Sequence, residues 1–176
     1  MRRKRQKPIK PEFDALVVDL SDPMLRSAAY LLRDPILAKD VVQEAFIRTY
    51  THWDRAQELP RAYAWTTLMN LCRDQHRRWA RHRDVLGMAI PDTPFGQELM
   101  EDRAIESLEL DRIVRSLPDR QREVVVLRYL VGMSVSETAG VLGMPTGTVK
   151  STCSRAIATL RANLGVEEQE VRIHVD

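Results

Sequence analysis

The sequence predicts an all-α protein: two small helical domains joined by a flexible acidic linker, with a C-terminal helix-turn-helix. Apolar residues recur at helical spacing along most of the 176 residues, whereas the alternating pattern of strands is almost absent. Prolines and glycines stand at expected helix boundaries rather than in runs. Between residues 84 and 102 the helical pattern stops, and prolines, glycines and acidic residues replace it.

The charge is small overall but unevenly distributed. The formal net charge is +2, yet the first ten residues are rich in cations. The basic residues there are Arg2, Arg3, Lys4, Arg5, Lys7 and Lys10. We expect residues 1–11 to form a disordered basic arm, which either adds nonspecific attraction to DNA or is simply a solvated tail.

The location of the protein and the state of its thiols can also be predicted. No apolar run approaches the roughly 20 residues of a membrane span, and no signal-peptide pattern is present. We therefore expect a cytoplasmic protein without membrane contact. Cys72 and Cys153 lie far apart on apolar helical faces and are predicted to be reduced core thiols.

Two Asp-Pro pairs predict helix starts in the N-terminal part. In each pair, at residues 22–23 and 34–35, the aspartate can cap the helix and the proline suits the first helical position. The sequence therefore predicts a short helix over residues 12–20, a second helix from the first pair, and a third over 35–53.

The helix over 35–53 has two chemically different faces. Its apolar stripe, which should face the core, is Val42, Ala45, Phe46, Thr49 and Trp53. Its other side carries Asp40, Gln43, Glu44 and Ile47, with Arg48 one turn after Glu44. The residues alone favour an ordinary solvated face with a weak ion pair between Glu44 and Arg48.

After a polar loop over 54–60, a basic helix is expected over 61–83. Its core stripe is Trp65, Leu68, Met69, Cys72 and Trp79. A second, mostly cationic stripe is Thr66, Asn70, Arg73, Arg77 and Arg81, flanked by His76, Arg78 and His82. Cations beside the aromatic ring of Tyr63 suit single-stranded nucleic acid, since they can bind phosphates while rings stack on bases. A basic solvated face with Trp65 in the core is an equally open alternative.

Residues 84–104 are predicted to be the linker, and helical periodicity resumes from 105. From Leu117 to Leu164 the chain carries the signals of one helix, a glycine break and two short helices. Pro118 and Asp119 suit a first helical turn, and Gly132 is expected to end that helix. Residues 165–176 are predicted to fray.

The turn between the last two helices is strongly specified. Ser134 and Glu137 form the S-x-x-E pattern of a capping box, which starts the first of the two helices. Gly143 and the Met-Pro pair after it should end that helix, and Thr146 is placed to cap the next. This order of signals predicts a helix-turn-helix.

The last helix also separates its faces by chemistry. Its apolar stripe is Val149, Cys153, Ala156 and Leu160. The opposite side carries Thr146, Thr148, Lys150, Ser151, Ser154 and Arg155. Because residues 144–164 contain no acid, this side suits phosphates and the base edges of the major groove. A purely structural three-helix bundle is the alternative.

Catalytic chemistry has no support in the sequence. The four histidines, His52, His76, His82 and His174, show no metal-ligand spacing with the cysteines, and no glycine-rich loop could cradle a phosphate. We therefore expect neither an enzyme nor a bound metal or cofactor.

The order of these parts resembles the extracytoplasmic-function sigma factors of bacterial RNA polymerase, members of the sigma-70 superfamily. The resemblance rests on D-x-V-Q-E-A-F from residue 40, on the basic run over 62–83, and on L-P-x-x-Q-R-E-V and G-T-V-K-S in the last third. It extends over nearly the whole chain. It implies a promoter-specificity subunit that binds core polymerase, recognises the minus-35 and minus-10 elements and promotes melting of the DNA.

The resemblance also implies a role for each face. The polymerase-binding residues would be Asp40, Gln43, Glu44, Ile47 and Arg48. The minus-10 residues would be Arg61, Tyr63, Asn70, Arg73, Arg77 and Arg78. The minus-35 residues would be Thr146, Thr148, Lys150, Ser151, Ser154 and Arg155.

The domain limits and partners follow from the same resemblance. A region 2-like domain is expected over 12–83 and a region 4-like domain over 105–164. The implied partners are core polymerase, through the clamp helices of its largest subunit and its flap region, and promoter DNA, both as duplex and as non-template single strand. An anti-sigma protein is a further candidate partner.

Some residues depart from the pattern of that family. Thr152 and Cys153 replace the arginine and aliphatic residue that many members have after G-T-V-K-S, so a different base preference is expected. The loop before Tyr63 lacks the phenylalanine common in that part of the family. Two other readings stay open: a stand-alone dimeric helix-turn-helix regulator, and an interaction protein that sequesters a polymerase or a sigma factor.

Overall fold

The computed structural model describes residues 10–86 and 112–164, and every regular element in these two ranges is a helix. The predicted linker lies outside the described residues except for its first three positions, because the helix expected to stop at 83 continues to Leu86. The predicted basic arm, apart from its last two residues, and the predicted C-terminal tail also lie outside them. None of the described helices is long and apolar enough to cross a membrane.

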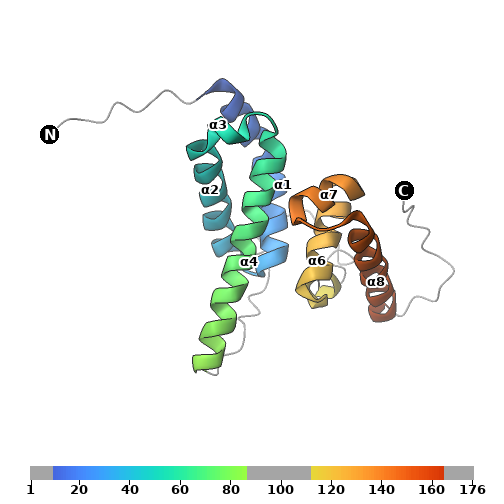
Figure 1. Cartoon of the computed structure of the whole chain (residues 1–176). Coiled ribbons are helices and arrows are strands. Elements are labelled where there is room, and N and C mark those ends of the chain that lie inside the picture. Colours follow the sequence, from blue (N-terminus) through green and yellow to red (C-terminus); the bar gives the residue numbers. More distant parts are fainter. Residues whose placement is uncertain (1–9, 87–111, 165–176) are drawn as a thin grey trace.

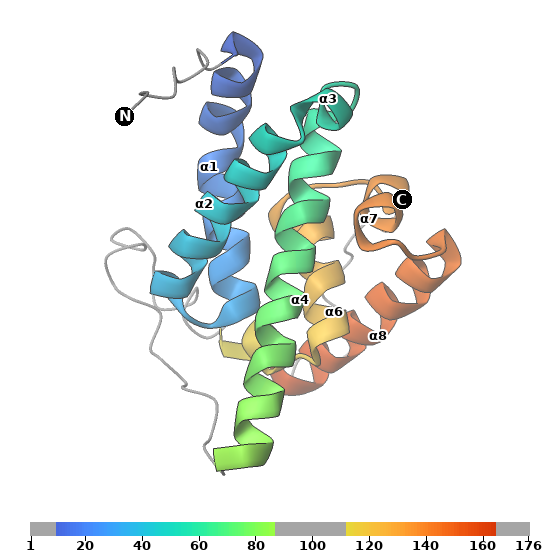
Figure 2. The ribbon, with the colours of Figure 1, turned by 60° about the vertical axis from the view of Figure 1, so that its left-hand side comes forward.

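The helices form two groups (Figure 1). The N-terminal group consists of α1 (Pro11–Leu32), α2 (Pro35–Thr51), the short α3 (Trp53–Ala56) and α4 (Pro60–Leu86). The C-terminal group consists of α6 (Asp119–Val125), its π-helical continuation η2 (Val126–Leu130), α7 (Val135–Leu142) and α8 (Thr146–Leu164). Both α4 and α1 border the second group: α4 packs on α7, and α1 packs on η2 and α6 (Figure 2).

The predicted break at residues 21–23 is wrong, because α1 continues without interruption through Pro23. A proline inside a helix leaves the carbonyl four residues earlier, here that of Asp19, without its usual donor. Tertiary packing outweighs this loss: Leu20 and Met24, on either side of the proline, have no exposed surface. Asp22 therefore does not cap a helix and lies exposed within α1.

The second Asp-Pro pair behaves as predicted. The carboxylate of Asp34 accepts hydrogen bonds from the backbone N–H groups of Ile36 and Leu37, at 2.9 and 3.0 Å, and caps α2. Arg33, just before it, has a left-handed φ of 58°, and its N–H donates to the carbonyl of Ala29 at the end of α1. The chain therefore turns sharply, and α2 folds back along α1.

The helix that begins at Asp119 ends in an unusual way. Over η2 the hydrogen bonds skip five residues instead of four, so that the N–H of Val131 donates to the carbonyl of Val126 at 3.0 Å. Gly132, at φ 80°, then ends the helix, as the sequence predicts. The π-helical geometry was not predicted.

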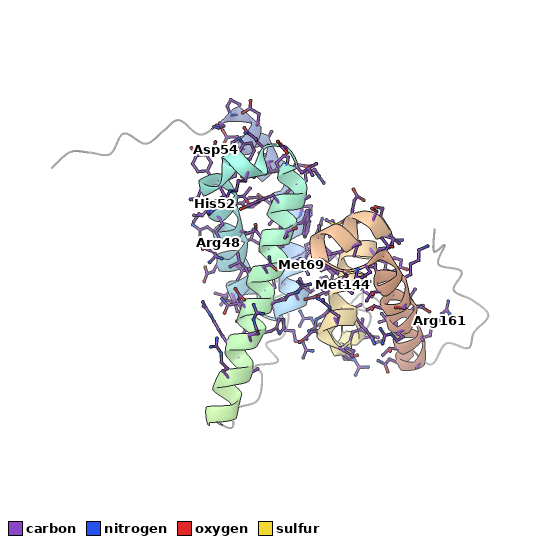
Figure 3. The ribbon with its side chains drawn as sticks, in the orientation of Figure 1. Arg48, His52, Asp54, Met69, Met144 and Arg161 are labelled. Atoms are coloured by element: carbon purple, nitrogen blue, oxygen red, sulfur yellow. The ribbon has the colours of Figure 1, made fainter. Side chains whose placement is uncertain are left out.

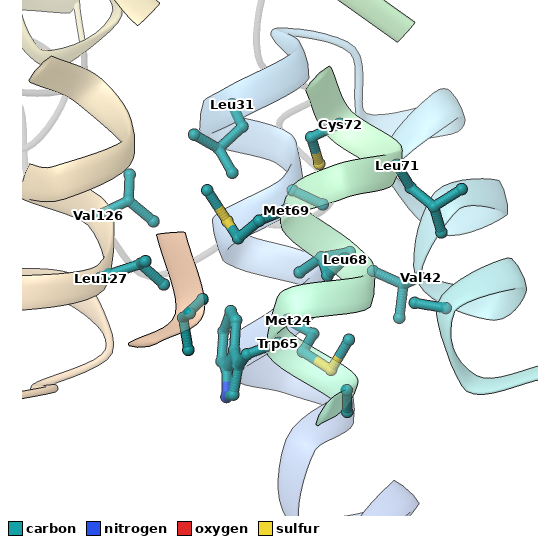
Figure 4. Packing of buried hydrophobic residues seen from close by; sticks show 14 of the residues in the cluster. Met24, Leu31, Val42, Trp65, Leu68, Met69, Leu71, Cys72, Val126 and Leu127 are labelled. Carbon is teal, nitrogen blue, oxygen red and sulfur yellow. The ribbon is translucent and has the colours of Figure 1, made fainter. Parts of the chain in front are cut away.

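One apolar cluster extends through both groups of helices (Figure 4). Met24, Trp65 and Met69 of the N-terminal group belong to the same buried cluster as Val126 and Leu127 of η2. We call these five residues the interdomain core. The predicted stripes of α2 and α4 also lie inside, with Phe46 and Trp79 partly exposed at its edges.

The two prolines give a matched test of the fold. We expect Pro23→Ala to raise the free energy of unfolding by about 1–2 kcal/mol, because alanine restores the hydrogen bond to Asp19 inside α1. Pro35→Ala is the control, since a proline at a first helical position withholds no needed N–H. Urea unfolding measures both variants. Equal changes for the two would contradict this account of α1.

Candidate nucleic-acid interface

The outer face of α8 presents all six polar residues that the sequence analysis placed there. They are Thr146, Thr148, Lys150, Ser151, Ser154 and Arg155, and each is exposed. Val149, Cys153 and Ala156 of the opposite stripe are buried. No residue of α8 is acidic, so the whole exposed face can approach phosphates without repulsion.

Residues close together in the sequence determine where α7 starts and how the chain turns from α7 into α8. Ser134 and Glu137 form the predicted capping box: the Ser134 hydroxyl accepts from the Glu137 N–H, and the Glu137 carboxylate accepts from the Ser134 N–H. Gly143 ends α7 at φ 63°, and α8 starts three residues later. Thr146 is the first helical residue of α8 rather than its cap, because the carbonyl of Pro145 already accepts the N–H groups of Thr148 and Val149.

Thr152 and Cys153 do not belong to this exposed face. Both are buried, and the Thr152 hydroxyl lies 3.3 Å from a guanidinium nitrogen of Arg155, which donates to it. The Cys153 thiol lies 3.4 Å from the hydroxyl of Tyr129. The two residues that depart from the pattern therefore lie in the packing below the exposed face and beside Arg155, not among the six exposed polar residues.

Helix α4 carries a second cationic surface, which we call the ridge of α4. Arg61, Asn70, Arg77 and Arg78 are exposed on it, and Tyr63 is half-buried in its first turn. Trp65 is only 1% exposed, so it belongs to the core and cannot stack on a base in this arrangement. Near the ends of the ridge, Arg61 pairs with Asp19 and Arg77 pairs with Asp74.

Arg73 of the predicted α4 set is bound by the C-terminal group. Its Nε and Nη2 atoms donate to the two carboxylate oxygens of Glu123 in α6, at 2.7 and 2.9 Å. Arg120 donates to the same carboxylate at 2.9 Å. The Glu123 side chain is 9% exposed, and this bidentate contact raises the pKa of Arg73.

Further polar contacts lie near this pair; those from Arg33 to Arg115 and from His76 to Asp119 join the two groups. Arg33, at the end of α1, donates to the carbonyl of Arg115 at 2.6 Å, and Arg122 donates to the same carbonyl at 2.7 Å. His76 of α4 lies 3.0 Å from the carbonyl of Leu31 and 3.8 Å from the carboxylate of Asp119. Figure 3 shows Met69 of α4 and Met144 after α7 on facing sides of the two groups. Sequence reasoning missed these contacts; its only signal was Glu123, a lone acid before the apolar run of α6.

A third surface covers the outer side of α2. Asp40, Gln43, Ile47 and Arg48 are exposed, and Glu44 is half-exposed. Glu44 accepts a hydrogen bond from Arg48 at 2.6 Å, which is the predicted helical ion pair. Ile47 is 51% exposed among these polar groups, and Arg48 points outward in Figure 3. An apolar side chain ringed by charges is typical of a protein-binding surface.

Cys72 and Cys153 are free and buried, as predicted. Burial is the main cause that raises the pKa of the Cys72 thiol to about 12. That thiol therefore stays protonated near neutral pH and is a poor nucleophile.

Comparison with known proteins covers both groups of helices. The family description of sigma-70 region 2 matches residues 16–82, and that of sigma-70 region 4 matches residues 107–160. The chain is 37% identical over 163 residues to the RNA polymerase sigma-E factor of Streptomyces coelicolor, which covers 92% of this chain and 90% of that protein. It is 29% identical to the ECF RNA polymerase sigma factor SigW of Bacillus subtilis, over 93% and 97% of the two chains.

Two solved structures share the fold. The sigma factor RpoE of Bartonella quintana, in complex with the anti-sigma factor NepR, superposes with a TM-score of 0.77 at 23% identity, over 90% of this chain and 99% of that one. CnrH, in complex with the cytosolic domain of CnrY, superposes with a TM-score of 0.64 at 27% identity, over 87% of both chains.

His76 predicts a pH dependence of stability. Burial, followed by the positive charge of Arg122, lowers its pKa, although Asp119, the carbonyl of Leu31 and Glu123 partly oppose the shift. The unfolded chain therefore takes up the proton first as the pH falls below about 6.5, the ordinary histidine value. We expect the free energy of unfolding to fall from that pH downward, until folded His76 is protonated as well.

The control variant for this prediction is His76→Gln, which keeps a side-chain donor for the carbonyl of Leu31 but does not titrate. Urea unfolding of both proteins between pH 8 and pH 5 gives the difference in their stabilities. The free energy of unfolding of the parent chain should exceed that of His76→Gln above pH 6.5, and this difference should shrink on acidification. A difference that is constant across this range would contradict the assignment to His76.

Proposed function

The chain belongs to the extracytoplasmic-function sigma factors of the sigma-70 class, and from that premise we propose that its three exposed surfaces bind three different targets. A sigma factor is a non-enzymatic subunit of RNA polymerase that recognises promoters and starts transcription. Sigma factors bind both core polymerase and promoter DNA. What the family does not specify is which side chains of this chain make each contact.

The exposed face of α8 is assigned to the minus-35 element as duplex DNA. The observation that carries this assignment is the exposure of all six polar residues above a buried apolar stripe, with no acid on the helix. A helix of this kind enters the major groove with its N-terminal residues toward base edges. Lys150 and Arg155 supply the charges for phosphate or guanine contacts.

The ridge of α4 is assigned to the non-template strand of the minus-10 element. Arg61, Asn70, Arg77 and Arg78 are exposed along one helix, and Tyr63 lies half-buried at its start. Cations and one available ring suit a strand whose bases are unstacked. Binding of unstacked bases favours the melted form of the DNA, which is how this surface would promote melting.

Arg73 can join that surface only after it leaves Glu123. In the structure the two groups of helices pack against each other, and we call this the packed arrangement. In it, Nε and Nη2 of Arg73 both donate to the Glu123 carboxylate on α6. We therefore assign the packed arrangement to the protein before it binds a promoter. Engagement of α4 along its full length requires α6 to move away, and the N-terminal and C-terminal groups then bind the two promoter elements separately.

The outer face of α2 is assigned to the clamp helices of the largest polymerase subunit, with the flap region as a second polymerase contact of the chain. Exposed Ile47 surrounded by Asp40, Gln43 and Arg48 supports a protein partner rather than DNA, because two acids lie on this face. An anti-sigma protein is a further proposed partner, since the similar structure of RpoE is a complex with the anti-sigma factor NepR. A protein that serves polymerase is expected in the cytoplasm.

The polymerase surface is tested by a double substitution. Asp40→Ala with Glu44→Ala should weaken binding of the full chain to core polymerase by at least about tenfold, because it removes both carboxylates of the face. Asp14→Ala with Asp54→Ala is the matched control, since these exposed acids lie on α1 and α3. Binding is measured by fluorescence anisotropy of the labelled chain, with circular dichroism as a check on folding. Unchanged affinity in the first variant would refute the assignment of α2.

The two DNA surfaces should respond differently to loss of an arginine. Arg155→Ala should alter selectivity at one or two minus-35 base pairs by about 1–3 kcal/mol. Arg77→Ala should weaken promoter binding evenly across sequences and reduce the salt slope by about one unit. Binding of the holoenzyme to a promoter library at several salt concentrations measures both effects. Identical selectivity of Arg155→Ala and the parent chain would count against base contact by α8.

A further inference from the structure

A pocket of about 720 Å³ lies between the two groups of helices, away from the Arg73–Glu123 contact. One wall is the corner between α3 and α4, and the other is the turn from η2 into α7. The N-terminal wall consists of Glu58, Leu59, Pro60, Arg61, Ala62, Trp65 and Thr66. The C-terminal wall consists of Val131, Gly132, Met133, Glu137, Gly140 and Val141. This volume is within the range of sites for small molecules.

The side chain of Trp65, which lines this pocket, carries a hydrogen-bond donor without an acceptor in the part of the chain that the structure describes. The ring is 1% exposed, and its indole nitrogen has no acceptor among the described residues. Figure 4 shows this nitrogen at the end of the ring that faces away from Met69, toward the start of α4. The pocket residues Glu58 to Ala62 lie at that end of the helix. A buried N–H donor without an acceptor is costly, so a ligand that accepts from it gains affinity.

The charges around the pocket limit the chemistry of such a ligand. Arg61 is paired with Asp19, and Glu137 is held by its hydrogen bonds to Ser134, which lower its pKa with a smaller contribution from Arg61. Together with Glu58, the pocket has two carboxylates and one guanidinium, so a carboxylate ligand would be repelled. Most of the remaining lining is apolar, and Leu59 at the edge is 71% exposed.

We propose that this pocket binds a neutral, mostly apolar small molecule whose carbonyl oxygen accepts the indole N–H of Trp65. The carbonyl satisfies the buried donor, and the apolar body replaces water against Leu59, Met133 and Val141. Because the walls come from both groups of helices, the ligand binds the packed arrangement better than the separated one. It therefore shifts the protein toward the state in which Glu123 holds Arg73.

The test uses the fluorescent probe 6-propionyl-2-(dimethylamino)naphthalene, which is neutral and apolar and carries one carbonyl. Its emission shifts to the blue when it leaves water, so a titration of the full chain without polymerase or DNA measures binding. We expect one saturable site. The analogue 2-(dimethylamino)naphthalene, which lacks the carbonyl and is measured by its displacement of the probe, should bind about fivefold to tenfold more weakly, as expected for loss of one hydrogen bond. Absence of saturable binding, or equal affinity for the two probes, would overturn the proposal.

Two substitutions locate the site. Trp65→Phe removes the N–H but keeps a ring, so the two probes should then bind equally. Gly140→Leu places a side chain in the pocket without strain, since a Cβ at Gly140 meets nothing within 4 Å, and it should abolish binding. Gly147→Leu is the matched control, because its Cβ also has open space but lies on α8 outside the pocket. Full binding in Gly140→Leu would refute this location even if Trp65→Phe failed to fold.

Discussion

The carboxylate of Glu123 joins the two helical groups whose separation we propose for promoter binding. A nearly buried carboxylate is strongly unfavourable without cationic partners, and here Arg73 from α4 and Arg120 from its own helix supply them. Around this contact, the interdomain core removes Trp65, Met69 and Leu127 from water. Separation of the groups would hydrate the ion pair and expose this apolar surface at the same time. The ion pair and the interdomain core are therefore expected to be lost together when the two groups separate.

This contact also explains how the candidate surfaces differ in availability. The polar face of α8 and the outer face of α2 point away from the interface and are exposed without any rearrangement. The ridge of α4 is divided instead: Arg77 and Arg78 are exposed, while Arg73 is bound to α6. A partner that binds α2 or α8 could thus associate first, and the complete α4 surface would form only after the groups part.

Local chemistry made much of the fold and of the α8 face predictable from sequence. The Asp34 cap, the Ser134–Glu137 capping box and the left-handed Gly143 depend on residues within a few positions of one another, so sequence spacing is sufficient. Helical period likewise placed the six polar residues between Thr146 and Arg155 on one exposed face, but it did not identify Thr152 as buried. The uninterrupted α1 was not predictable in this way, because burial beside Pro23 depends on helices distant in the chain. Nor was the pairing of Arg73 with Glu123, since 50 residues separate them.

The π-helical turn of η2 acts as a one-residue insertion in the helix that leads to the DNA-reading unit. Each residue of an α-helix advances the chain by about 1.5 Å and rotates it by about 100°. Returning η2 to α-helical geometry would therefore turn α7 and α8 by about that angle around the axis of α6. The contact between α7 and α4 would be lost, and α8 would point in a different direction relative to α4. The rotational angle between α4 and α8, the two helices proposed to bind DNA, is thus set by a single extra residue between Val126 and Leu130.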